Sequence, residues 1–271
     1  MRILYLNPYS RGLSGADESL LALLQQVITR GVKPALILPA PGPNVQRYQA
    51  LGVDVHYAPL ALIGRRTSAT ERALFLPRAL RNSVRVARIA RDVGAELIHS
   101  NMEVALEGGI AARLLGIPHV FHYRGNTNDD PKIVFDVLTA IWTALADRIF
   151  CISQGTAAVF QRRNRGEKVR VLYNPIVIGP YRDAAVDPAI RSELGAGDED
   201  ILVGTVARLH PRKDLETMVN AAAELVQRFP NLRFVVVGGA EAPVEKAYEL
   251  ELASLIKARG LSDRFRLAGP R

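Results

Sequence analysis

The sequence predicts an α/β protein built from two domains, each with a parallel sheet. Short strand-like runs alternate with helical patterns along the whole chain, and this alternation is typical of a parallel sheet covered by helices on both faces. The alternation breaks once, between Asn174-Pro175 and Gly179-Pro180, where prolines and a glycine indicate a linker. A second alternation then runs to the end of the sequence. We therefore expect domains at 1–174 and 175–271.

The first domain begins with a strand at Arg2–Leu6 and a helix at Asp17–Arg30. Leu20, Leu24 and Ile28 lie on one face of that helix at the 3.6-residue period. Pro77 is expected to precede a helix at Arg78–Val93, with further helices near 105–115 and 132–146. The remaining expected strands are Ala35–Leu38, Val53–Tyr57, Leu97–His99, His119–His122, Arg148–Ile152 and Val169–Leu172.

The second domain reads as strand 201–206, a helix from about Asp214 to Pro230, and strand Arg233–Val237. A helix over 243–258 and a strand at Arg264–Ala268 follow. This βαβαβ order is one mononucleotide-binding half of a doubly wound sheet.

Composition excludes several classes of protein. A hydrophobic content of 48% and a charged content of 23% are ordinary for a soluble globular chain. No apolar run approaches the ~18 residues of a membrane span, and no secretory signal is recognisable, so we expect a cytoplasmic location. The single cysteine, Cys151, is expected to be a buried apolar residue.

The net charge of +8 is concentrated in one segment, since Arg65–Arg91 contains eight arginines and one glutamate. Arg78, Arg81, Arg85 and Arg88 are spaced so that they share one helix face. This pattern fits either a solvated basic face or a surface that attracts anionic lipids, at ~1 kcal/mol per basic residue. A nucleic-acid partner is not expected, because the chain has no known binding motif and only 6% aromatic residues.

Polar residues follow the first and fifth strands. The turn after the first strand contains Gly12 and Gly15, which allow a close approach of backbone to ligand, but it is not a G-x-G-x-x-G fingerprint and fits a plain βα turn equally well. His122, Arg124 and Asn126 lie at the end of the fifth strand, where open α/β sheets bind ligands, although a histidine there can also be structural. The five histidines show no ligand spacing, and no metal is expected.

The loop after strand 201–206 carries Arg208 and Lys213 to the start of a helix. Free backbone N–H groups and the helix dipole favour an anion at such a position. The sequence therefore indicates a phosphate site, and the alternative is a solvated basic loop.

Several segments together resemble the family 4 retaining glycosyltransferases of the GT-B fold. The loop Gly12–Glu18 is similar to the family's N-terminal glycine loop, and His122-Tyr123-Arg124-Gly125 to its sugar-pocket loop. The segments 146–153 and 171–175 resemble the last long strand of the N-terminal domain and the interdomain hinge. The most specific similarity is between 204–213 and the family's donor-binding motif.

This resemblance implies a transferase whose donor is a nucleotide sugar, with the sugar linked to UDP or GDP. The transfer would retain the anomeric configuration of the sugar. It implies that Arg208 and Lys213 bind the donor diphosphate with Gly15 nearby. His122 would be the catalytic residue beside the transferred sugar, and Arg124 and Asn126 would line the acceptor or sugar pocket. The acceptor would be a glycan or a lipid-linked glycan, at the inner face of the membrane. No cofactor is implied, because GT-B enzymes typically need no metal.

The sequence departs from the family pattern at Ser14 and Asp214, which stand where glycines are usual, and it lacks the family's later Glu-x₇-Glu motif. We therefore expect a C-terminally truncated chain, in which strand 201–206 lies at a sheet edge and promotes self-association. Two alternatives stay open. One is an inactive fragment that acts as a binding or structural module, and the other is a GT-B nucleotide-sugar epimerase.

Overall fold

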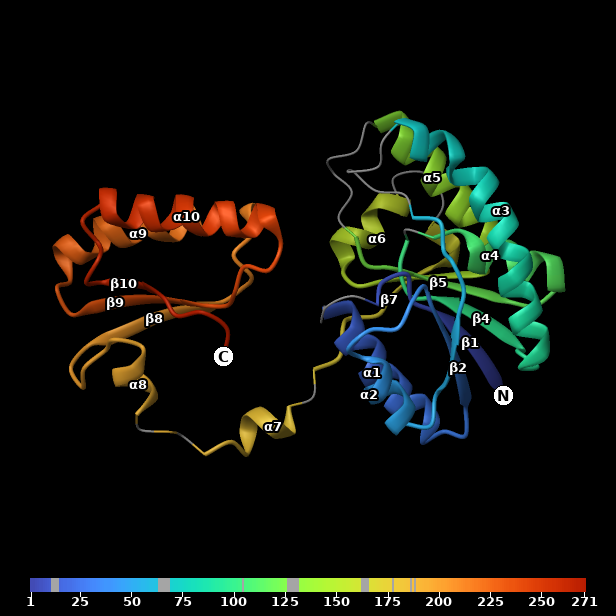
Figure 1. The fold of residues 1–271 in the computed structure, drawn as a ribbon, viewed down its shortest axis with the longest axis horizontal. Helices are drawn as coiled ribbons and strands as arrows, with labels where there is room; N and C mark the ends of the chain where they lie inside the picture. The colour runs from blue at the N-terminus through green and yellow to red at the C-terminus, as the bar shows by residue number, and fades with distance from the viewer. Residues whose placement is uncertain are drawn as a thin grey trace. The chain divides into compact units, whose positions relative to one another are not determined.

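The computed structural model describes residues 1–10, 15–62, 69–103, 105–125, 132–161, 166–176, 178–185, 187 and 189–271. The chain forms two compact units, Met1–Tyr181 and Arg182–Arg271 (Figure 1). The units divide after Tyr181, beyond the predicted boundary at Asn174. Each unit has its own core and is an α/β layer structure.

The N-terminal unit contains a seven-stranded parallel sheet in the order β3-β2-β1-β4-β5-β6-β7. Strand order reverses direction along the sheet after β1, as in doubly wound folds. The strands are β1 (Arg2–Leu6), β2 (Lys33–Leu38), β3 (Asp54–Tyr57), β4 (Leu97–Ser100), β5 (His119–Tyr123), β6 (Arg148–Cys151) and β7 (Val169–Val171). The seven strands predicted for this domain are all present, with ends that shift by up to two residues.

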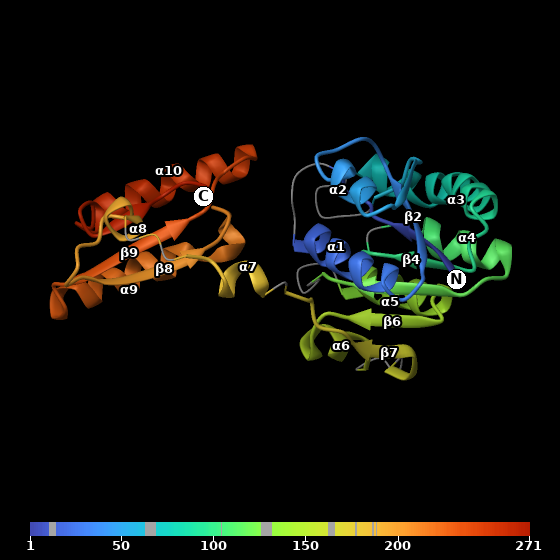
Figure 2. The ribbon, with the colours of Figure 1, turned by 90° about the horizontal axis from the view of Figure 1, so that it is seen from below.

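Helices cover both faces of this sheet (Figures 1 and 2). One face packs against α1 (Gly15–Ile28) and α2 (Val45–Ala50) through Tyr5, Leu24 and Tyr48. The other face packs against α3 (Ala69–Asp92), α4 (Glu107–Leu115), α5 (Lys132–Leu145) and α6 (Gln154–Gln161). Cys151 is buried on this second face, among residues of α5 and α6, as expected.

The prediction for α3 was wrong at its start, because the helix begins at Ala69 and runs through Pro77. A proline inside a helix removes one backbone hydrogen bond and crowds the preceding turn. Phe75, which is buried together with Ala79, shows why the extra turns form. The packing of this aromatic ring outweighs the local preference to begin the helix after the proline.

The linker prediction was also partly wrong. A short helix, α7 (Gly179–Arg182), contains both Gly179 and Pro180, which were expected to exclude regular structure. Proline is tolerated in the first turn of a helix because the N–H it lacks has no partner there.

The C-terminal unit contains a three-stranded parallel sheet in the order β10-β9-β8, with a short helix α8 (Ile190–Glu193) before it. The strands are β8 (Ile201–Val206), β9 (Leu232–Val237) and β10 (Phe265–Leu267). Between them run α9 (Leu215–Arg228), which follows a 3-10 turn at Pro211–Lys213, and α10 (Pro243–Ala258). The predicted βαβαβ order is confirmed, and β8 is an edge strand of this sheet.

Candidate functional site

A polar cluster lies at the carboxyl ends of the three central strands of the N-terminal unit. Asn7 follows β1, Asn101 follows β4, and Arg124 follows β5, and these strands are neighbours in the sheet. Parallel strands end at one edge, so the polar residues that follow them come together there. Asn101 Nδ2 donates to Asn7 Oδ1 at 3.3 Å, and Asn7 Nδ2 donates to the buried carboxylate of Asp17 at 2.7 Å.

Arg124 connects four separate segments of this unit. Its Nε donates to the Asn101 carbonyl at 3.0 Å, and its Nη1 donates to Ser19 Oγ at 2.9 Å and to Asn174 Oδ1 at 2.6 Å. Burial lowers the pKa of Arg124 to about 10, partly offset by the charges of Glu103 and Asp17, and the group remains a cation at neutral pH.

Glu103 supports the loop that carries Arg124. It is 7% exposed, and its Oε2 accepts a hydrogen bond from the Arg124 backbone N–H at 3.1 Å. Burial raises the pKa of Glu103, although backbone N–H groups and the Arg124 charge act in the opposite direction. A Cβ atom at position 125 would collide with the Glu103 carboxylate, so the close approach requires Gly125.

His122 lies beneath Arg124 and is buried, with 2% of the residue exposed. Its Nδ1 is 3.2 Å from Arg124 Nη2, and its ring stacks on that of His99 with centroids 5.8 Å apart. Burial, together with Arg124 and His99, lowers the pKa of His122 to about 2. The imidazole is therefore neutral, accepts from Arg124 at Nδ1 and carries its proton on Nε2, which has no hydrogen-bond partner among the described residues.

A cavity of about 150 Å³ opens beside His122 and Arg124. Its walls come from α1, from the end of β5 and from the segment after β7. Most of the lining is apolar, and it consists of Ser19, Ala22, Leu23, Gln26, His122, Arg124, Leu172, Tyr173 and Pro175. The pocket can therefore hold a small group with one polar side against Arg124 and Ser19.

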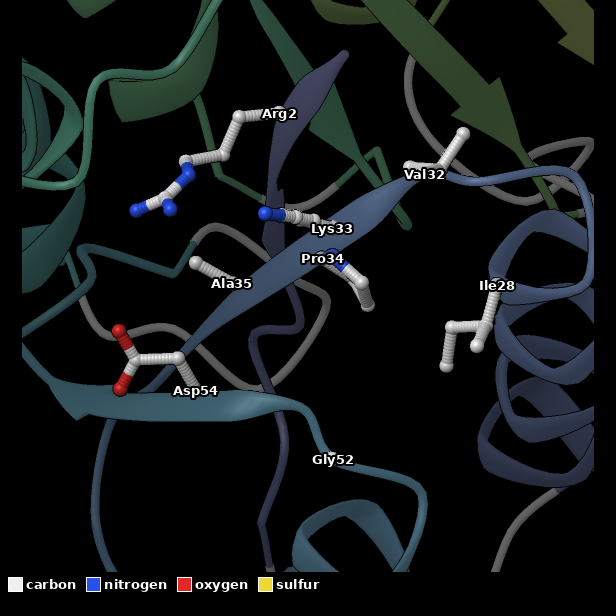
Figure 3. A pocket seen from close by; sticks show the side chains of 8 residues that line it. All are labelled: Arg2, Ile28, Val32, Lys33, Pro34, Ala35, Gly52 and Asp54. Atoms are coloured by element: carbon white, nitrogen blue, oxygen red, sulfur yellow. The ribbon is translucent and has the colours of Figure 1, made fainter.

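A larger cavity of about 340 Å³ lies at the opposite, amino edge of the same sheet (Figure 3). Arg2, Lys33 and Asp54 come from the starts of β1, β2 and β3. Ligands of open α/β sheets bind at the carboxyl edge, so this cavity is not the candidate site despite its volume.

Among the residues that the structure describes, no contact supports a binding role for two of the predicted site residues of this unit, Gly15 and Asn126. Gly15 is the first residue of α1, and open space surrounds the position that a Cβ atom would take there. Asn126 lies outside the described residues, as does Gly12.

In the C-terminal unit, Arg208 and Lys213 both lie in the loop between β8 and α9, as predicted. The Arg208 side chain is 70% exposed, and its Nη1 lies 3.1 Å from Oε1 of Glu245, a carboxylate that is 3% exposed. Glu245 Oε2 accepts from the backbone N–H groups of Glu241 and Ala242, the two residues directly before α10. Glu245 thus fixes the start of one helix and one side of Arg208.

The opposing effects on Glu245 can be ordered. Burial would raise its pKa, but the two backbone N–H groups and the charge of Arg208 outweigh burial and lower it. The carboxylate therefore stays ionised at neutral pH and holds the guanidinium at the loop.

Lys213 ends the 3-10 turn and is exposed. The next residue, Asp214, has φ 50°, a left-handed conformation that favours glycine. This geometry gives a physical reason for the glycine that the resemblance expects at this position. The Asp214 side chain accepts from Thr217 Oγ1 at 2.9 Å, which offsets part of the strain.

The backbone around the loop is closely packed. At Gly238, which has φ 153°, a Cβ atom would collide with the carbonyl of Ala207 directly after β8. Leu209, between the two cations, is 1% exposed and donates its N–H to the Gly239 carbonyl at 3.1 Å. Two glycines after β9 therefore hold the segment that carries Arg208 and Lys213.

Sequence reasoning missed the polar residues around Arg124 and the carboxylate that pairs with Arg208. Asn7 and Asn101 each directly follow a strand, and Glu245 is the third residue of a helix that begins with Pro243, so their positions could have been noticed, but Ser19, Glu103 and Asn174 carry no local signal. Within the described ranges, no three His, Cys, Asp or Glu side chains gather as metal ligands.

Comparison with known proteins supports the assignment suggested by these loops. A family model described as Glycosyltransferase Family 4 matches residues 13–178, and one described as Glycosyl transferases group 1 matches residues 186–271. The chain belongs to glycosyltransferase family 4.

Two curated relatives of this family 4 chain are transferases by name. A human phosphatidylinositol N-acetylglucosaminyltransferase subunit is 25% identical over 262 residues, which cover 95% of this chain and 50% of that protein. The alpha-D-kanosaminyltransferase of Streptomyces kanamyceticus is 26% identical over 200 residues, covering 67% and 50%. The chain spans about half the length of the curated relatives it matches.

Solved structures show the GT-B fold for this family 4 chain. Anabaena Alr3699/HepE in complex with UDP matches with a TM-score of 0.79 and 23% identity, over 100% of this chain and 70% of that one. A glycosyltransferase from Rickettsia africae matches at 0.76 and 13%, over 100% and 68%. A UDP-N-acetylglucosamine 2-epimerase matches at 0.60 and 14%, over 100% and 69%, so the fold by itself does not select the reaction.

Proposed function

We propose that the chain transfers a sugar from a nucleotide-sugar donor to a glycan or lipid-linked acceptor, with retention of the anomeric configuration. The observation that carries this proposal is the loop between β8 and α9, which presents Arg208 and Lys213 and in which Glu245 pairs with Arg208 and Gly238 packs against Ala207. Family membership and this loop support the same reaction class.

The donor is proposed to be a sugar linked to UDP, and a sugar linked to GDP is the alternative. Anabaena HepE has been solved with UDP and with UDP-glucose, and the human relative is named for the transfer of N-acetylglucosamine. In the reaction, the bond between the anomeric carbon and the β-phosphate oxygen breaks. A bond to the acceptor hydroxyl oxygen forms on the same face of the sugar, and the proton of that hydroxyl goes to the departing diphosphate oxygen.

The leaving diphosphate gains negative charge as its bond to the sugar breaks. Cations positioned at such an oxygen stabilise the transition state more than the ground state. We assign this role to Lys213 and Arg208, and we expect no metal ion to be required.

The pocket beside His122 and Arg124 is proposed to bind part of the transferred sugar or the acceptor. An imidazole with a pKa near 2 stays neutral at neutral pH and does not readily accept a proton. His122 therefore fits N–H donation better than proton transfer. Arg124 fits hydroxyl recognition, because its N–H groups already bond to neutral oxygens of Ser19 and Asn174.

Nucleotide-sugar turnover tests this function. The chain would be incubated with UDP- and GDP-sugars and a panel of glycan and lipid-linked acceptors, while release of the nucleoside diphosphate is followed. Release that depends on acceptor and is lost in Lys213→Ala supports the proposal. Binding without release would favour the alternative of an inactive binding module, and conversion of the sugar without an acceptor would favour the epimerase.

A further inference from the structure

Helix α3 exposes an apolar ridge that none of the described elements covers. Leu76, Leu80 and Val84 are spaced by four residues, so they form one line along the helix, and each is 51–52% exposed. The buried side of α3, which includes Phe75, Ala79, Val86 and Ala90, is centred about 110° around the helix from this line. The ridge is therefore extra to what the fold requires of this helix.

A row of arginines runs beside the ridge. Arg88, Arg81 and Arg85 are exposed and lie about 80°, 100° and 140° around the helix from Leu80, and Arg78 lies about 160° from it on the same side. Among the described residues, none of these four forms an ion pair with a carboxylate, and Arg85 donates weakly to the Tyr57 carbonyl at 3.3 Å. Apolar and cationic stripes side by side on one exposed face characterise helices that lie at a membrane surface.

The position of α3 relates this face to the candidate site. The helix follows β3, so its first half lies toward the carboxyl edge of the sheet, where the Arg124 cluster is found. A cavity of about 290 Å³ between α3 and the segment after β3 is lined by Arg78, Arg81 and Asn82 together with Leu60, Leu62 and Phe75. Glu71 is also part of its lining.

We propose that this face of α3 docks the protein on an anionic lipid bilayer, with the ridge among the headgroups and the arginines against lipid phosphates. Charge complementarity selects this occupant, because the segment from Ala73 to Arg91 contains five arginines and no carboxylate. Figure 1 shows α3 on the outside of the N-terminal unit. This docking rests on the proposed function and deepens it, because it places the protein on the bilayer that holds a lipid-linked acceptor. The binding to lipid itself requires no substrate.

Vesicle binding tests this surface directly. The 271-residue chain would be floated with phosphatidylcholine vesicles and with equimolar phosphatidylcholine–phosphatidylglycerol vesicles at low and high salt. One variant, Arg78→Gln/Arg81→Gln/Arg88→Gln, removes the charge, and a second, Leu76→Gln/Leu80→Gln/Val84→Gln, removes the ridge. The matched control, Arg30→Gln/Arg148→Gln/Arg170→Gln, removes the same net charge from other exposed positions of the unit.

We expect salt-sensitive binding to the anionic vesicles only. The arginine variant should weaken it about 100-fold, because each basic residue near the surface contributes ~1 kcal/mol. The ridge variant should weaken it on the order of tenfold, and the control should bind nearly as well as the parent chain. Circular dichroism melts establish that each variant folds.

Three results would overturn the proposal. The first is no flotation at low salt, and the second is equal loss in the control, which would indicate nonspecific attraction. The third is a dimer in solution that the ridge variant dissociates, which would assign the ridge to a second copy. Because flotation uses no nucleotide, failure here leaves the turnover assay unaffected, and failed turnover leaves the docking result intact.

Discussion

Two charged side chains, Arg124 and Glu245, hold the candidate sites by joining segments that are distant in sequence. Arg124 contacts Ser19, Asn101 and Asn174. Glu245 contacts Arg208 and the backbone N–H groups of Glu241 and Ala242, directly before α10. Both are fixed by several hydrogen bonds at once, so the loss of either leaves buried polar groups without partners, which is costly.

Replacing Glu245 by glutamine should lower the free energy of unfolding by about 1 kcal/mol at neutral pH, since charge-assisted bonds to N–H groups and Arg208 become neutral. The folded-state pKa of Glu245 is lowered from its ordinary value of 4.5, so its stabilisation is complete above that pH and is lost as the pH falls below it. Urea titrations at pH 7 and pH 4 should therefore show a smaller difference between parent and variant at pH 4. An equal difference at both pH values, or the same effect in exposed Glu251→Gln, would contradict this role.

The buried histidines predict acid sensitivity of the N-terminal unit. Burial lowers the pKa of His99 to about 3 and that of His119 to about 4, from an ordinary value of 6.5. Below pH 6.5 the unfolded chain binds protons that the folded chain does not, so stability falls as pH decreases toward these values. Each such histidine contributes a slope of up to about 1.4 kcal/mol per pH unit.

His99→Gln should therefore flatten the dependence of unfolding free energy on pH between 6.5 and 4 by close to one proton. Glu103 and Glu107, whose pKa values are raised, act in the opposite direction, but they are present in both chains and cancel in the comparison. His56→Gln, at a side chain that is 30% exposed, is the control. An unchanged slope in His99→Gln would show that His99 binds its proton over the same pH range in the folded as in the unfolded chain.

At the scale of elements, periodicity and composition predicted every strand of both sheets and most of the longer helices. The failures occurred where packing decided against local preference. Pro77 indicated a helix start, whereas burial of Phe75 extends α3 to Ala69. Short elements such as α2 and α6 have too few residues to show a helical period.

Pro77 inside α3 leads to a direct prediction. Pro77→Ala restores a backbone N–H in an exposed part of the helix and should raise the free energy of unfolding by about 1–3 kcal/mol. A thermal melt of the two chains measures this, with Pro59→Ala, outside any helix, as the control. A variant no more stable than the parent would mean that the turns before Pro77 are not part of a continuous helix.

The exposed edge of strand β8 leads to a prediction about self-association. Ile201 is 56% exposed and Val206 is 85% exposed on the edge of their sheet, a surface that favours pairing with a further strand. We expect the chain to self-associate there, and light scattering should show Val206→Lys shifting it toward the monomer. A parent chain that stays monomeric at high concentration would contradict the expectation.

For the whole molecule, the sequence predicted the two sheets and the places of Arg208, Lys213, His122 and Arg124 in loops or at strand ends. It did not predict the network that fixes them, because Asn7, Ser19, Asn101 and Asn174 come together only once four segments have folded around one sheet edge. The same holds for Glu245, which is 37 residues from the arginine it contacts. Local patterns identify cations that can bind an anion, whereas tertiary packing selects the groups that orient them.

The central claim is that the loop between β8 and α9 binds a nucleoside diphosphate. Calorimetric titration of the chain with UDP and GDP tests it most directly, with Lys213→Ala as the variant and exposed Lys257→Ala as the matched control. We expect saturable binding that Lys213→Ala weakens by about tenfold to hundredfold, the range of a charge-assisted hydrogen bond, while Lys257→Ala binds as the parent does. Absence of binding to either nucleotide, or equal binding by Lys213→Ala, would contradict the account.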